Sequence, residues 1–451
     1  MPRNFRRFPQ DRQPTDAGAS GPGSPATLQR RIGTFDATLI GLGSMLGAGV
    51  FAAFTPAAQA AGDGILIALL IAACVALCNA TSTAQLAAQY PSSGGTYLYG
   101  RQQLGPWWGY IAGWGFVVGK TASASAIALT FAWAVAPDGW ERPVAIITVI
   151  TLAFANWRGI TRTAQLTRIL VVLVVLSLML SVLASWGGTP FEPFARLAQF
   201  DPLAKGWYGI LQASGLLFFA FAGYARIATL GEEVKNPERT IPRAILGALS
   251  LALLLAAVVA FTLLTTLGSL GIAQCPAPLV TAIQFGEAPD WMTMVPRIGA
   301  AVASLGALLG LLAGISRTTL AMARERDLPA PLARIQASTS TPSLALLVIT
   351  VITCGVLTVG DFTDAIGFSS FGVLIYYAIT NVAAFTQSGS ARRYPRIVQA
   401  AGLLCCLALI ATLPPSSILL GFGVFAVGIA LRVLRLGLRR RSVRRSGSGP
   451  S

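Results

Sequence analysis

The chain has 451 residues, of which 54% are hydrophobic and only 11% are charged, whereas about one-quarter of an ordinary soluble domain is charged. So few charges cannot cover a soluble protein of this length, and most of its exterior is therefore expected to face lipid. Since the chain has no histidine and its six cysteines lie mostly in apolar runs, we expect no metal, no cofactor and no histidine-based catalysis.

Long apolar runs predict an all-α polytopic membrane protein with twelve transmembrane helices. The bilayer core needs about 20 helical residues, and the runs are too long for strands and lack a two-residue alternation. The predicted spans are residues 35–61, 64–88, 106–136, 143–157, 165–186, 207–230, 242–268, 295–322, 342–359, 363–386, 396–412 and 415–434.

Glycines interrupt the first predicted span. Residues 41–49 contain four glycines, and each glycine in a helix interior costs about 1 kcal/mol. We expect the helix to break there and a second half-helix to begin near Gly47, where free amides would attract a carboxylate. The alternative is close helix packing, which is our interpretation of Gly306, Gly310 and Gly314, spaced four residues apart in the eighth span.

Two cationic side chains fall inside predicted spans. Lys120 lies at the middle of the third span, and Arg226 follows Gly223, where we expect the sixth span to break. An ionised residue at mid-membrane costs about 2.5–3.5 kcal/mol, so each should face protein, water or an anion. Each is interpreted either as a coupling-proton site or substrate contact, or as a structural charge. Such a charge would pair with a neighbouring half-helix, with freed carbonyls or, for Arg226, with Asp36.

The distribution of basic residues predicts the orientation. With twelve spans and a cytoplasmic N-terminus, 27 of the 33 Lys and Arg residues lie in cytoplasmic segments, as the positive-inside rule requires. The net charge of +16 therefore reflects topology and does not indicate a nucleic-acid partner. Arg432, Arg435 and Arg439 recur at helical spacing near the C-terminal end, and we expect them to lie against anionic lipid.

The interrupted first and sixth spans stand five spans apart. Because five is odd, a repeat of five spans places its second copy upside down, which predicts inverted repeats over about residues 34–186 and 207–386. Glycine-interrupted segments in corresponding positions of two inverted halves indicate the binding site of a secondary transporter. The free amides of the first span would bind an anionic group, and the freed carbonyls of the sixth span would bind a cationic group. An amino acid zwitterion carries both groups.

These segments resemble the amino acid–polyamine–organocation (APC) permease family. Residues 43–51, GSMLGAGVF, are similar to its span-one pattern G-x-x-x-G-x-G-(I/V)-F, and residues 232–242, EEVKNPERTIP, to its loop pattern E-E-x-x-(N/D)-P-x-(R/K)-x-(I/L)-P. The resemblance extends over about residues 32–386. Further matches are residues 90–97, 218–224, and 316–317 with 323–329.

The resemblance implies roles for particular residues. The amides of residues 47–49 would hold the substrate carboxylate, the carbonyls of Phe219 and Ala222 with backbone around Ser44 would hold the amino group, and Tyr224 would be a gating aromatic. The implied substrate-binding residues are Gly43, Ser44, Gly47, Ala48, Gly49, Phe219, Ala222, Gly223 and Tyr224, with Lys120 and Arg226 as candidate coupling or electrostatic residues. The fifth span departs from some members of the family, because Val174 stands where they have a lysine.

The sequence predicts a secondary active transporter that moves amino acids across the plasma membrane by alternating access, with coupling to protons or by exchange, and not an enzyme. The alternatives are a polyamine or organic-cation transporter and a membrane sensor or channel on the same scaffold. The two membrane cations would favour neutral or acidic substrates over Lys and Arg. The predicted parts are a disordered basic cytoplasmic tail (1–33), a transport core (34–386), two peripheral spans (387–434) and a basic cytoplasmic tail (435–451).

Overall fold

The computed structural model describes residues 32–91, 94–159, 164–187, 200–231, 233–336, 339 and 341–446. Within these ranges the protein is all-helical, and extended segments pair only in two isolated bridges, Ile32 with Val234 and Gln336 with Thr341. The tail predicted over residues 1–33 lies almost entirely outside the described residues, as does Glu232 of the family-like loop.

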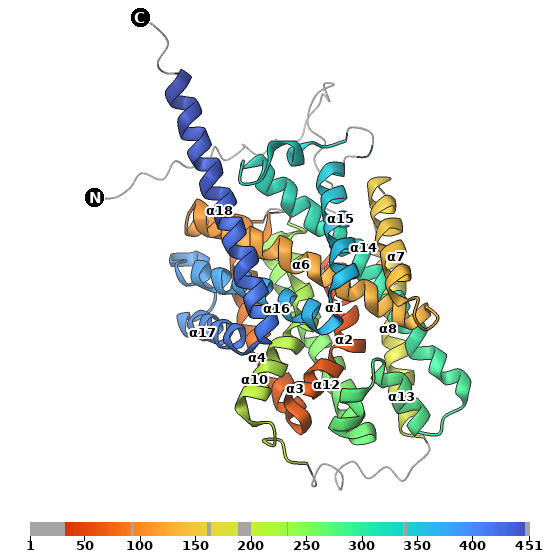
Figure 1. The fold of residues 1–451 in the computed structure, drawn as a ribbon. Coiled ribbons are helices and arrows are strands. Elements are labelled where there is room, and N and C mark those ends of the chain that lie inside the picture. The colour runs from red at the N-terminus through yellow and green to blue at the C-terminus, as the bar shows by residue number, and fades with distance from the viewer. Residues whose placement is uncertain are drawn as a thin grey trace, which may run out of the picture.

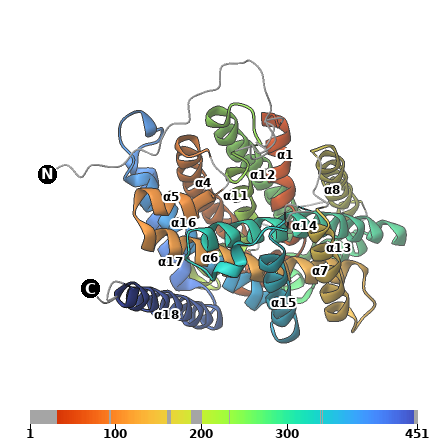
Figure 2. The same ribbon diagram turned by 90° about the horizontal axis from the view of Figure 1, so that it is seen from above.

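The helices pack into one bundle (Figure 1), and α18 lies at its edge in both views, extending beyond its neighbours (Figures 1 and 2). The helices are α1 (Thr34–Met45), α2 (Ala48–Ala52), α3 (Phe54–Ala61), α4 (Ile65–Gln89), α5 (Gly95–Gln103), α6 (Pro106–Val135), α7 (Glu141–Trp157), α8 (Ala164–Ser185), α10 (Gly206–Phe221), α11 (Ala225–Ala228), α12 (Pro237–Gln274), α13 (Pro278–Phe285), α14 (Met294–Arg324), α15 (Ser343–Val359), α16 (Phe362–Phe385), α17 (Arg396–Thr412) and α18 (Pro415–Ser446).

Each of the twelve apolar runs found in the sequence forms helix in the structure, and the first and sixth runs do so in separate pieces. Nine helical stretches of the described part are long and apolar enough to cross a membrane, and α15 and α17 are shorter apolar helices. The helix that holds the seventh run is longer than predicted, because α12 extends from Pro237 to Gln274 with a kink at Gly268, whose φ of 69° favours glycine. The helical runs are confirmed, whereas the number of membrane crossings stays a prediction.

The outer helices expose apolar side chains at helical spacing. On α8, Ile169, Val172, Leu173, Leu176 and Leu180 are each about half exposed and share one face of the helix. Such a surface is stable in lipid and not in water. Tryptophans near the ends of helices are also exposed, as expected of residues at a membrane interface: Trp107, Trp108, Trp140, Trp157, Trp207 and Trp291.

Buried polar side chains tie α4 to α16 inside the bundle. Asn381 accepts a hydrogen bond from Ser82 at 2.6 Å and donates one to Asn79 at 2.6 Å. All three residues are completely buried. Since unpaired polar groups are costly in a lipid-embedded core, these hydrogen bonds favour one alignment of α4 along α16.

The prediction that Arg432 lies against anionic lipid is wrong. Its side chain is only 6% exposed, and Nη2 lies 3.0 Å from an Asp327 carboxylate oxygen. The guanidinium also lies over the rings of Trp107 and Tyr110, at 4.6 and 4.4 Å from their centroids. An acid more than a hundred residues away along the chain therefore decides the position of this arginine, and helical spacing in α18 alone did not reveal it.

Candidate binding site

Both helices predicted to break are interrupted at the expected glycines. The first run stops at Met45, the end of α1, and resumes as α2 at Ala48, with Gly47 between them in a non-helical conformation. The sixth run leaves α-helical geometry after Phe221 and passes through a 3-10 turn, Ala222–Tyr224, into α11. The positions of the two breaks are confirmed.

The same glycines let the two breaks touch. A Cβ atom on Gly223 would lie 2.5 Å from the carbonyl oxygen of Ser44, and one on Gly49 would lie 2.5 Å from the Cα of Ala220. Because the opposing atoms belong to the backbone, no change of side-chain conformation could relieve these clashes. Breaking the helix and packing closely, which the sequence left as alternatives, are therefore both functions of these glycines.

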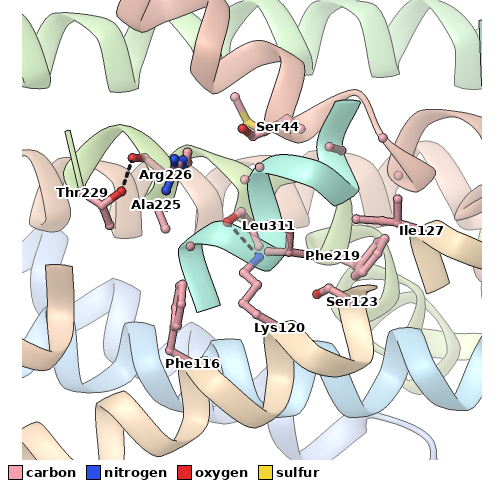
Figure 3. Close-up of a pocket in the computed structure, with 18 residues that line it drawn as sticks. Ser44, Phe116, Lys120, Ser123, Ile127, Phe219, Ala225, Arg226, Thr229 and Leu311 are labelled. Atoms are coloured by element: carbon pink, nitrogen blue, oxygen red, sulfur yellow. Dashed lines mark hydrogen bonds between the residues drawn. The ribbon is translucent and has the colours of Figure 1, made fainter. Parts of the chain in front are cut away.

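A cavity lies between the breaks and is closed by α6 and α14 (Figure 3). Its volume of about 60 Å³ holds roughly four to six water molecules, so the walls must open to admit a larger ligand. The predicted residues that line it are Ser44, Gly47, Gly49, Lys120, Phe219, Ala222, Gly223 and Arg226. The other lining residues are Met45, Phe116, Ser123, Ile127, Ala225, Thr229, Ala307, Gly310, Leu311 and Gly314.

Two predicted residues of the described part do not line this cavity, and the side chain of a third, Ala48, lies outside the described residues. Gly43 faces a separate small crevice beside α8. Tyr224 is completely buried, with its ring 5.3 Å from that of Tyr377. In this arrangement the aromatic side chains at the cavity are Phe116 and Phe219, so the geometry does not assign Tyr224 the gating position that the resemblance implied.

Lys120 is hydrogen-bonded to a backbone carbonyl that the break in the sixth run leaves free. Its side chain is 7% exposed, and Nζ donates a hydrogen bond to the carbonyl oxygen of Ala222 at 3.1 Å. The Tyr377 hydroxyl also donates to this oxygen, at 3.5 Å. Among the roles that the sequence left open for Lys120, the structure shows pairing with a freed carbonyl. A substrate ammonium group could reach Ala222 only by displacing these donors.

Arg226 faces the cavity without the partner that we expected. Asp36 instead accepts a hydrogen bond from Nε of Arg168 at 2.7 Å, so the predicted pairing of Asp36 with Arg226 is wrong. Nη1 of Arg226 is buried and has no hydrogen-bond partner in the described part of the chain. It lies 3.4 Å from the position that a Cβ on Gly314 would take.

The glycines of α14 open onto the cavity. A Cβ on Gly310 would meet no described atom within 4 Å, and one on Gly314 would meet only Nη1 of Arg226, at 3.4 Å. The prediction that these two glycines serve close helix packing is therefore wrong. Together with Ala307 and Leu311 they recur at i, i+3, i+4 and i+7, which places them on one helix face. The spacing was visible in the sequence, but it does not say whether that face meets another helix or a cavity.

On α6, the other lining residues could have been found from Lys120. Phe116, Ser123 and Ile127 stand four residues before it and three and seven residues after it. A helix brings these positions onto the same face, so the membrane-buried cation indicated the correct face of the helix.

Residues 32–431 match the sequence profile of the family described as amino acid permease. The chain belongs to the amino acid permease family. This family is part of the APC superfamily, so the resemblance seen in the sequence is confirmed, and the permease is a transporter and not an enzyme.

Relatives of the permease carry transporter names with different substrates. It is 50% identical over 425 residues to an uncharacterized transporter of Mycobacterium tuberculosis, covering 94% of this chain and 95% of the relative. It is 24% identical over 343 residues to the branched-chain amino acid permease of Bacillus subtilis, covering 71% and 72% of the two chains. It is 25% identical over 392 residues to the methylthioribose transporter of Bacillus subtilis, covering 80% of each chain.

Proposed function

We propose that this permease is a secondary active transporter that carries amino acids across the plasma membrane by alternating access. The observation that carries the proposal is the cavity between the two helix breaks, where Gly49 and Gly223 bring the interrupted backbones into contact. Irregular backbone at membrane depth is stable only beside a cavity or ligand. A binding cavity would explain why both helices are broken here. Its small volume is consistent with a closed state of a site that opens to one side of the membrane at a time.

The proposed topology has twelve crossings with both termini in the cytoplasm. It is supported by the helices found in every predicted run and by the positive-inside rule, because this topology would put 27 of the 33 basic residues on the cytoplasmic side. The proposed inverted repeats span about residues 34–186 and 207–386, and the two breaks fall in corresponding positions of these halves. The last two helices, α17 and α18, would be peripheral, with anionic lipid near the basic C-terminal end.

The proposed substrate position follows the family resemblance. Amides of residues 47–49 would hold the carboxylate, and carbonyls near Phe219 would hold the ammonium group. Because Lys120 now donates to Ala222, we propose that substrate arrival displaces Lys120 from this carbonyl. That displacement would couple binding to the protonation of Lys120, which favours proton coupling, with exchange as the alternative.

Reconstitution in liposomes tests this function. Labelled amino acids are offered with a proton gradient, with a sodium gradient and with neither. In a parallel set, the vesicles already contain unlabelled substrate when the label is added outside. Saturable uptake accelerated by unlabelled substrate on the opposite side supports a carrier. Flux without such acceleration would support a channel, and saturable binding without flux would support a sensor.

The polyamine or organic-cation alternative is tested with the same vesicles. Such ligands lack a carboxylate and would not need the amides after Gly47, and two cations already line the cavity. We expect Gly47→Leu to abolish uptake of amino acids in vesicles that contain normal amounts of protein. Full uptake of putrescine by wild type and by this variant would support the alternative. Methylthioribose belongs in the panel because a relative carries that name.

A further inference from the structure

We infer that Arg226 binds a carboxylate on the side chain of the substrate, so that the permease selects acidic amino acids. The inference rests on the proposed function and names its substrate class. It starts from the charge of the cavity: Lys120 and Arg226 both line it, and none of the described lining residues is Asp or Glu. A cavity with two cations and no acid attracts an anionic ligand and repels a cationic one.

Among the described side chains that line the cavity, that of Arg226 has a buried donor without a partner. The hydroxyls of Ser44, Ser123 and Thr229 are each bonded within the protein, and Lys120 donates to a backbone carbonyl. By contrast, Nη1 of Arg226 is buried without a partner among the residues that the structure describes. A buried donor with no acceptor is costly, so a ligand that supplies the acceptor gains affinity from it.

No described acid forms an ion pair with Arg226. Glu233 is paired with Arg317 at 3.7 Å, and Asp36 is paired with Arg168 at 2.7 Å. Within the described chain Arg226 therefore has no ion pair. A guanidinium group presents a planar fork of donors that matches the two oxygens of a carboxylate, and it does so better than an ammonium group.

The geometry of α14 gives a substrate side chain a route to Arg226. Gly310 has open space where a Cβ would be, and Gly314 lies directly beside Nη1. Figure 3 shows Arg226 and Lys120 reaching the cavity from different helices. A side-chain carboxylate could therefore lie along the glycines against Arg226, whereas the ammonium group of a lysine side chain would meet like charges from two directions.

Wild-type protein in liposomes gives the first test, with labelled L-glutamate and L-glutamine as probes. These amino acids have nearly the same shape and differ in the charge of the side chain. We expect kcat/KM to be at least about tenfold higher for glutamate, and L-lysine not to compete. Equal or better transport of glutamine would overturn the inference and leave the proposed function standing. Failure to move any amino acid, with transport of another probe, would overturn both.

Arg226→Gln gives the second test through the ratio of glutamate to glutamine uptake in the same vesicles. A hydrogen bond to a charged group corresponds to about a ten- to hundredfold change in affinity, so this ratio should fall by at least tenfold. Arg226→Lys keeps the charge without the fork and should give an intermediate ratio.

Matched controls separate binding from a structural role. Glu233→Gln and Arg317→Gln alter the neighbouring ion pair without touching the cavity, and both should keep the wild-type ratio. If either lowers the ratio as far as Arg226→Gln does, or if Arg226→Gln lowers both rates equally, Arg226 acts through structure and the inference is wrong. If Arg226→Gln does not fold, the ratio of glutamate to glutamine uptake is compared between wild type and Arg226→Lys, and an unchanged ratio would overturn the inference.

Discussion

Asp327 is the centre of a buried set of ionic contacts that joins α18 to the rest of the bundle. Its carboxylate accepts hydrogen bonds from the hydroxyl of Tyr97 at 2.8 Å and from Arg101 at 3.3 Å, and it lies 3.0 Å from Nη2 of Arg432. The side chain of Asp327 is only 8% exposed and that of Arg432 only 6%. Burial and the adjacent carboxylate raise the pKa of Tyr97, so its hydroxyl stays a donor. We expect Asp327→Asn to destabilise the protein strongly.

The magnitude follows from what Arg432 would lose. Its Nε and Nη1 already lack hydrogen-bond partners in the described residues, so Asp327→Asn would leave the guanidinium with aromatic faces and a neutral amide. Removing one partner of a buried ion pair costs about 3–5 kcal/mol, because the other charge stays buried without compensation. Contacts with the two rings would not replace this, because they already exist in the wild type and contribute only about 2 kcal/mol or somewhat more when desolvated.

Reversible unfolding in mixed detergent micelles, followed by circular dichroism, measures the change. The matched control is Asp361→Asn, because Asp361 pairs with Arg142 at 3.4 Å while their side chains are 78% and 48% exposed. An exposed pair contributes about 1 kcal/mol or less. Asp327→Asn combined with Arg432→Met should recover part of the loss, since no buried charge is then left unpaired. Equal losses for the two Asn variants would refute the argument from burial.

Four further substitutions test the close approach of the broken helices, the hydrogen bonds of Asn381 and the role of Lys120 in coupling. Gly49→Ala would drive a Cβ into the backbone of α10 and should cost about 1–3 kcal/mol, lowering the folded yield in size-exclusion chromatography. Gly310→Ala has open space and should keep the yield, so an equal loss from both would contradict the close-approach explanation. Asn381→Leu removes the shared partner of two buried side chains on α4. Each group left unsatisfied lowers the free energy of unfolding by about 1–3 kcal/mol, so Tm should fall. A wild-type Tm would show that these hydrogen bonds do not stabilise the fold. Lys120→Met removes the Nζ donor to Ala222 and should make uptake insensitive to a proton gradient, whereas unchanged gradient dependence would exclude Lys120 from coupling.

Features set by short stretches of sequence were predictable. The helices follow from apolar runs longer than the bilayer core, and the breaks follow from glycines that destabilise a helix locally. Lys120 and Arg226 could be singled out because few charges lie within apolar runs. In each case the physical cause acts within about one helix, so the sequence contains it.

Contacts between distant segments were decided only by the tertiary structure. The sequence marked Gly310 and Gly314 as a small-residue face, but whether that face meets a helix or a cavity depends on how α14 docks. It left the partners of Arg226 and Arg432 open, because any acid at a suitable depth could pair with either. Packing placed Asp36 beside Arg168 and Asp327 beside Arg432. The sequence by itself therefore determined which residues are costly to bury, and the docking of helices decided which costs are compensated and left Arg226 facing the cavity.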